Sequence, residues 1–158
     1  MKKILVLLVT IVTLFAQDVF AQAKPQVSEE QKAAAKAKRE QLMQTRLELL
    51  KTELQLNDEQ LAKFEPVYRR YRGEIQRVTG ANKEARMKKD QITNENALLV
   101  VSARLANDVF TTTVKQRYVM LFAEVIEPLQ LMKLYRIDEK ISREANKILK
   151  AREEAAKQ

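Results

Sequence analysis

The side chains that most often carry catalysis are missing from this sequence. It has no histidine and no cysteine. A nucleophile–base pair built on either residue is therefore impossible, and so is a zinc or copper site of the usual nitrogen or sulfur type. The two glycines, Gly73 and Gly80, cannot form a phosphate-binding loop. Carboxylates alternate with lysines and arginines, whereas a glycosidase pair needs a cleft and a raised pKa. We therefore predict a protein that is not an enzyme, with no cofactor and no catalytic metal; whether carboxylates alone bind a metal stays open.

Basic side chains are the groups best suited to binding a partner. The formal net charge is +8 at pH 7, and such a charge attracts acidic proteins, anionic lipid headgroups or nucleic acid. The cations that we expect to form a basic rim follow one another along the middle of the chain: Arg69, Arg72, Arg77, Lys83, Arg86, Lys88 and Lys89. Each of them is equally compatible with a solvated helix face.

Helices must position this rim, because residues that favour helices dominate the sequence. The sharpest predicted helix start is Leu56-Asn57-Asp58-Glu59-Gln60-Leu61. Asn57 is a strong N-cap residue, and the side chain of Gln60 can reach back to its backbone N–H. Leu56 and Leu61 flank the cap at the spacing of a hydrophobic staple.

A second helix start has the same outline, Ile126-Glu127-Pro128-Leu129-Gln130-Leu131. Pro128 falls on the first helical position, where a proline loses nothing. Ile126, Gln130 and Leu131 repeat the apolar residue before the cap and the third and fourth helical positions. Glu127 is a poor cap, so this copy is the weaker one. The structural explanation of both segments is that they are good helix starts.

Apolar residues recur at helical spacing along four segments. The stripes are Met43, Leu47, Leu50 and Leu54; Leu61, Phe64, Tyr68, Tyr71, Ile75 and Val78; Leu99, Ala103, Ala106, Phe110, Val114, Tyr118, Leu121 and Val125; and Leu134, Ile137, Ile141, Ala145 and Ile148. We therefore predict an all-α fold, in which long amphipathic helices form a curved hairpin or bundle. Pro66 lies inside the second stripe and predicts a kink there.

The third of these segments is the most apolar. We expect it to be helical from about Glu95 to Val125, capped by Thr93 or Asn94. Further apolar residues extend its stripe around the cylinder: Leu98, Val101, Leu105 and Val109. Such a helix is the best candidate for the buried centre of the bundle or of a dimer. We expect a homodimer.

The N-terminus is typical of a secretion signal. Lys2 and Lys3 precede the apolar run Ile4–Ala16, and cleavage is favoured after Ala21. The run is shorter than the roughly 20 residues of a membrane span, although an uncleaved anchor is the alternative. No later stretch is predicted to span a bilayer. Export to the periplasm argues against nucleic acid as a partner. The predicted divisions are a signal peptide over 1–21, a flexible or frayed helical lead over 22–41, a helical domain over 42–150 and a polar tail over 151–158.

The two helix starts resemble the paired Leu-Thr-x-x-Gln elements of the Spy/CpxP family of periplasmic proteins. Here they read Leu56-Asn57-Asp58-Glu59-Gln60 and Ile126-Glu127-Pro128-Leu129-Gln130, both without the threonine, and the resemblance covers residues 42–150. It implies a curved helical hairpin that pairs into a cradle-shaped dimer. The family includes ATP-independent chaperones, adaptors that restrain a sensor kinase, and metal-responsive relatives. For the motif residues of this chain, the resemblance implies a structural role only.

The resemblance and the basic rim give our first hypothesis, a periplasmic ATP-independent chaperone-like protein that binds unfolded or misfolded envelope proteins. The alternative is a stress-sensing adaptor that binds and restrains a membrane sensor protein. A third possibility is a weak contact between the basic residues 83–89 and an anionic membrane surface. The sequence leaves open the client or sensor, the inducing stress and the concave surface.

Overall fold

The computed structural model describes residues 28–155. Our predictions for residues 1–27, the signal peptide among them, and for residues 156–158 lie outside this range. The chain divides into two units, residues 1–37 and residues 38–158, and the packing described below is that of the second unit.

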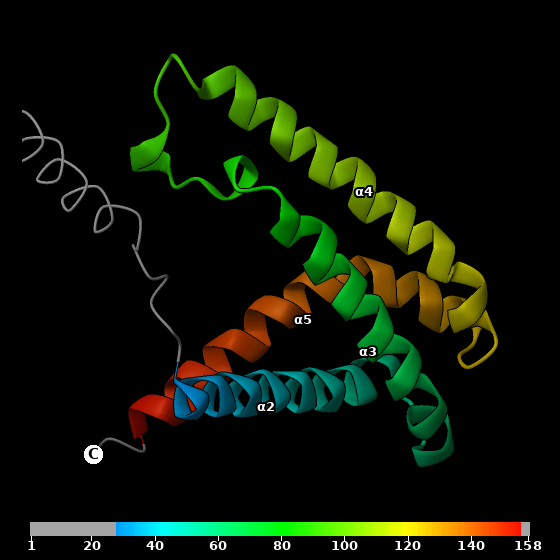
Figure 1. Ribbon diagram of the computed structural model, residues 1–158. Coiled ribbons are helices and arrows are strands. Elements are labelled where there is room, and N and C mark those ends of the chain that lie inside the picture. The colour runs from blue at the N-terminus through cyan, green and yellow to red at the C-terminus, as the bar shows by residue number, and fades with distance from the viewer. Residues whose placement is uncertain (1–27, 156–158) are drawn as a thin grey trace, which may run out of the picture. The chain divides into compact units, whose positions relative to one another are not determined.

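Residues 28–155 contain helices and no strand, which confirms the predicted all-α fold. The α-helices are α2 (Glu29–Leu54), α3 (Asp58–Ala81), α4 (Ala97–Ala123) and α5 (Pro128–Ala155), as Figure 1 shows. Two short 3-10 helices, η1 (Glu84–Arg86) and η2 (Lys89–Gln91), lie in the connection between α3 and α4. Residues 29–41, part of the predicted flexible or frayed helical lead, form the first half of α2, and α5 continues into the predicted polar tail as far as Ala155.

The start of α3 is the predicted capping box. The side-chain oxygen of Asn57 accepts a hydrogen bond from the backbone N–H of Gln60 at 2.8 Å, and the backbone N–H of Asn57 donates to the Gln60 side chain at 3.1 Å. Leu56 is buried, and Leu61 packs against the same core cluster, as expected of a hydrophobic staple. Pro66 lies inside α3 and withholds one backbone hydrogen bond from it.

The start of α5 repeats half of this arrangement and adds a contact between helices. The backbone N–H of Glu127 donates to the Gln130 side chain at 2.8 Å, and α5 begins at Pro128 as predicted. The amide nitrogen of Gln130 also donates to the backbone carbonyl of Leu54 at 2.9 Å. Carbonyls at a helix C-terminus have no partner within their own helix. Gln130 therefore closes the last turn of α2 while it caps α5.

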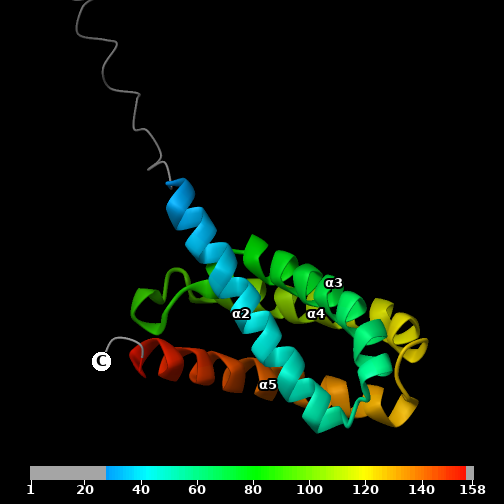
Figure 2. The same ribbon diagram turned by 90° about the horizontal axis from the view of Figure 1, so that it is seen from below.

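The helices pack as two antiparallel pairs. At one end of the α2–α5 pair Lys38 forms an ion pair with Glu153, and towards the other end Lys133 forms one with Glu53. In the α3–α4 pair, the Tyr118 hydroxyl donates to Glu74 at 2.9 Å. Figures 1 and 2 show α4 lying alongside α3. Short turns at residues 55–57 and 124–127 join the pairs, which brings both helix-start motifs to the same region.

An aromatic cluster fills the core where the helices meet. Phe64, Tyr71 and Phe122 are fully buried. The ring of Phe122 lies 5.6 Å from that of Phe64 and 5.5 Å from that of Tyr71, centre to centre. Such ring contacts add to the burial of large apolar surfaces. The predicted stripes of α2 and α3 provide most of the surrounding core, whereas in the last turns of α5 Leu149 is buried in place of the predicted Ile148.

Our predictions for α4 need correction. Its N-cap is Asn96, not Thr93 or Asn94, and the Asn96 side-chain oxygen accepts a hydrogen bond from the Thr93 backbone N–H at 2.9 Å. More importantly, α4 is not the buried centre of the bundle. Among residues 28–155 it is the one helix long and apolar enough to cross a membrane by length and composition. Only 17% of its most apolar 18-residue stretch is buried. Our expectation that no later stretch meets this criterion was wrong.

Candidate functional site

Most of the exposed large apolar side chains of residues 28–155 lie on α4. We call Leu98, Val101, Leu105 and Val109 the outer stripe, because spacings of three and four residues place them on one face of the helix. Their exposed fractions are 81%, 53%, 59% and 64%. Phe110, at 53%, lies to one side of the stripe. Contiguous exposed apolar surface of this kind marks interaction sites in proteins.

The opposite face of α4 explains why the outer stripe has no place in the core. The residues of α4 that pack inward are Val100, Ala103, Val114, Tyr118 and Phe122. They point away from the outer stripe, since a helix turns about 100° per residue. The predicted stripe lies on this inward side but is only partly covered, because Ala103, Val114 and Tyr118 are buried whereas Leu99, Phe110 and Leu121 are exposed. One helix thus has two apolar faces, and the fold covers only one.

Four of the predicted rim residues lie together beside α4. Lys83, Arg86, Lys88 and Lys89 are all exposed in the connection between α3 and α4, which we call the basic loop. Arg104 of α4 holds this loop, because its guanidinium donates to the backbone carbonyls of Ala85 at 3.4 Å and Met87 at 3.1 Å. The structure therefore gathers these four cations in the connection that leads into α4, on the side of α4 where Ala103 is buried.

Arg69 and Arg72 do not belong to an open rim, which corrects our prediction. Arg72 is turned into the protein, where its guanidinium lies 2.9 Å from the carboxylate of Asp138. Arg69 forms ion pairs with Glu40 at 2.6 Å and Glu65 at 2.7 Å. Both arginines thus join α3 to its neighbours, and neither is free to meet a client.

The partner of Arg72 is the centre of a buried polar network. Asp138 is 2% exposed. It accepts hydrogen bonds from the hydroxyls of Tyr68 at 2.8 Å and Tyr71 at 3.2 Å, as well as the contact from Arg72. Burial and the negative charge of Asp138 raise the pKa of both tyrosines. A carboxylate taken out of water is tolerated when it is paired and fully hydrogen-bonded, as here.

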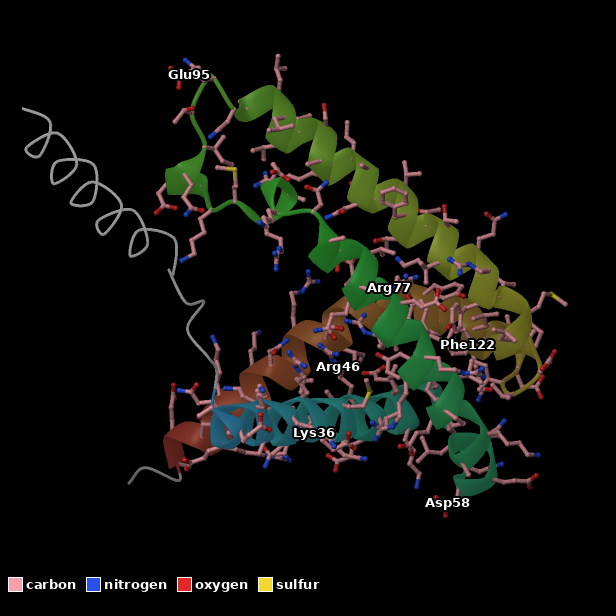
Figure 3. The ribbon with its side chains drawn as sticks, in the orientation of Figure 1. Lys36, Arg46, Asp58, Arg77, Glu95 and Phe122 are labelled. Atoms are coloured by element: carbon pink, nitrogen blue, oxygen red, sulfur yellow. The ribbon has the colours of Figure 1, made fainter. Side chains whose placement is uncertain are left out.

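Arg77 lies on another side of α3. It is exposed, and it lines a hollow of about 440 Å³ between α3 and α4 together with Arg70, Arg117 and Leu121. Arg117 forms an ion pair with Glu74 at 3.1 Å in the same hollow. Figure 3 labels Arg77 on α3 and Phe122 on α4. Of the predicted rim, Arg77 is thus the residue that remains exposed on α3.

The residues of the two helix starts have structural roles in this arrangement. Leu56, Ile126 and Leu131 are buried in the core, and Asn57, Gln60 and Gln130 make the cap contacts described above. Their part in function is to fix where α3 and α5 begin. No group of three or more acidic side chains that could hold a metal occurs within residues 28–155.

Comparison with known proteins identified no relative of this chain. No protein-family model matches the chain, and neither a curated protein nor a solved structure is significantly similar to it.

Sequence reasoning missed the network around Asp138, although the sequence carries a signal for it. Asp138 lies between Leu134 and Ile141, at stripe spacing on α5, and Arg46 lies in the same way between Met43 and Leu50 on α2. A charged residue within an apolar stripe must be paired if the stripe is buried. Opposite charges in the stripes of two helices therefore predict that those helices face each other.

Proposed function

We propose that this protein is an ATP-independent chaperone-like protein that binds unfolded or misfolded proteins. The observation that supports this function is the outer stripe, an apolar helix face without a partner within residues 28–155. Unfolded chains expose apolar segments, which such a face can cover. The proposal includes membership of the Spy/CpxP family and location in the periplasm, on the basis of the two helix starts and the N-terminal signal.

The basic loop suggests which clients are preferred. Its four cations are exposed in the connection that leads into α4, the helix that carries the outer stripe. A client segment that combines apolar and acidic residues therefore gains from both surfaces. Long-range attraction by exposed cations mainly raises the rate of encounter, and salt screens it. We therefore expect fast, weak binding that weakens further at high ionic strength.

A suppression assay tests the proposal. The protein is mixed with a chemically denatured, aggregation-prone acidic protein, and light scattering follows aggregation on dilution. We expect equimolar amounts to suppress aggregation. The double variant Leu105→Ser, Val109→Ser should lose this effect, whereas Glu139→Ser, Arg143→Ser, at exposed positions of α5, should retain it. Equal suppression by both variants, with circular dichroism showing both folded, would contradict the proposal.

A second copy of the chain competes for the same surface. The predicted homodimer could cover the outer stripe with its partner's α4, and sedimentation analysis of both double variants measures this. If only the variant of the outer stripe becomes monomeric, the stripe is a dimer interface. A crosslinked pull-down separates the chaperone from the stress-sensing adaptor, because one stoichiometric membrane protein favours the adaptor and a broad set of unfolded proteins favours the chaperone.

A further inference from the structure

Arginines surround a cavity between α2 and α3 that none of the roles above uses. Its volume is about 330 Å³. The residues that line it include Arg39, Arg46, Arg69 and Arg72, and none of the ten is acidic. All of them belong to α2 or α3, so the cavity is separate from the outer stripe on α4. Figure 3 shows Arg46 on the side of α2 that faces α3.

The carboxylates around the cavity do not balance its arginines. Glu40 and Glu65 pair with Arg69, and Asp138 pairs with Arg72. Arg46 has no ion pair or hydrogen bond with any residue in the range 28–155. Among residues 28–155, the nearest negative charge that acts on Arg46 is therefore that of Asp138, which is already paired with Arg72.

The position of Arg46 makes this imbalance costly. Its Nε is buried without a hydrogen-bond partner, and so is the Nε of Arg72. Burial first, and then repulsion by Arg72, lower the pKa of Arg46. A desolvated cation is destabilising unless an anion compensates it. Asp138 is a single carboxylate, already hydrogen-bonded to Tyr68, Tyr71 and Arg72.

We propose that this cavity binds a phosphoryl anion, with Arg46 as its main ligand. Guanidinium groups match the oxygens of a phosphoryl group and can bind them in pairs. Arg39 and Arg72 stand in the same wall and add positive charge. Leu42, Met43 and Ile75 also line the cavity, which suits a phosphoryl group attached to an organic body. The ligand class is therefore a phosphomonoester, and both a soluble phosphate and a lipid headgroup have this chemistry.

The first test uses inorganic phosphate as the probe. Thermal unfolding of the full chain is followed in phosphate and in chloride at matched ionic strength, and titration calorimetry measures the affinity. We expect phosphate to raise the melting temperature of the wild type. Arg46→Gln should lower the affinity at least about tenfold, as the loss of a charged hydrogen bond implies. Arg136→Gln, at an exposed position of α5 outside the cavity, should leave it unchanged.

Stability in chloride separates a binding role from a structural one. Because Arg46 is partly desolvated, is repelled by Arg72 and forms no ion pair in the range 28–155, the Arg46→Gln variant should melt in chloride at or above the wild-type temperature while it loses the response to phosphate. Arg39→Gln, at an exposed position of the same wall, gives a second variant if Arg46→Gln does not fold, and it too should weaken the response.

The second test identifies the source of the phosphoryl group. Phosphatidylcholine vesicles are prepared with phosphatidic acid, a monoester, or with phosphatidylglycerol, a diester, at equal surface charge. Preferential binding to phosphatidic acid that Arg46→Gln abolishes supports a lipid ligand, and a response to phosphate alone supports a soluble one. If neither probe gives a response that depends on Arg46, the proposal is overturned, and the aggregation assay of the outer stripe is unaffected by that result.

Discussion

The two faces of α4 are both apolar, yet the fold treats them in opposite ways. Phe122 on the inner face is fully buried among aromatic rings from α3 and α5. Phe110, on the same helix, is 53% exposed. Both are phenylalanines within one uninterrupted helix, so local propensity does not distinguish them. The difference comes from the neighbouring helices, which supply a complementary surface to one face only.

The comparison also shows that apolar composition is a poor guide to burial. α4 is the most apolar helix of the described chain, and it leaves most of that surface exposed. α3 and α5 are far more polar, yet they provide Tyr68, Tyr71 and Asp138 to the interior. The apolar side chains that α4 leaves exposed are accessible to a partner, whereas the charge of Asp138 is not. This contrast is the physical basis of the proposed chaperone-like function.

Truncation of the two phenylalanines tests the comparison most directly. Phe122→Ala should lower the free energy of unfolding by about 3–5 kcal/mol, because it leaves a cavity in the aromatic cluster. Phe110→Ala should change it by less than about 1 kcal/mol, as expected for a half-exposed residue. Urea unfolding of both variants measures the difference. Similar losses in the two variants would mean that the flank of α4 that carries Phe110 is covered in solution.

Removal of Asp138 tests whether the buried carboxylate joins the helices. Asp138→Ala should cost about 3 kcal/mol, because the guanidinium of Arg72 and two tyrosine hydroxyls lose their acceptor inside the protein. The neighbouring, exposed Glu139→Ala is the control and should lie within about 0.5 kcal/mol of the wild type. A loss of less than about 0.5 kcal/mol for Asp138→Ala would mean that water solvates the network in place of the carboxylate.

The two helix starts differ by one cap, and substitution can exchange their properties. Asn57→Ala should cost about 1 kcal/mol, because the N–H of Gln60 loses its acceptor. Glu127→Asn should instead stabilise the protein by about 0.5 kcal/mol, since it would supply the half of the capping box that α5 lacks. Thermal unfolding measures both, with Glu127→Ala as the near-neutral control. A loss on Glu127→Asn would argue that the side chain of Glu127 is needed.

Alkaline pH probes the two buried tyrosine hydroxyls. The pKa values of Tyr68 and Tyr71 are raised in the folded state, so their stabilisation is complete below the unfolded pKa near 10 and is lost as the pH rises towards the folded value. One such tyrosine should account for a loss of up to about 1 kcal/mol between pH 10 and pH 11. Tyr68→Phe should show a shallower loss than the wild type in urea unfolding across this range, and an equal slope would contradict the assignment.

The sequence by itself determined the helical character of the described chain and the starts of two of its helices. The cap at Asn57, the proline at Pro128 and the stripes of α2 and α3 are local signals, and each acts through contacts within a few residues. They predicted where α3 and α5 begin and which side of α2 and α3 is buried. The residues of the predicted basic rim that are exposed in the structure are Arg77, Lys83, Arg86, Lys88 and Lys89.

Only the tertiary structure decided which apolar and charged side chains are inside. Which face of α4 is covered depends on α3 and α5, which lie far from it in sequence or across a loop, and periodicity cannot choose between two apolar faces. In the same way, the sequence alone predicts Arg69 and Arg72 to be surface cations. In the structure Arg69 pairs with Glu40 of α2 and with Glu65 one turn earlier in α3. Arg72 pairs with Asp138 of α5. Burial is a property of the assembled helices, because it depends on what each face meets.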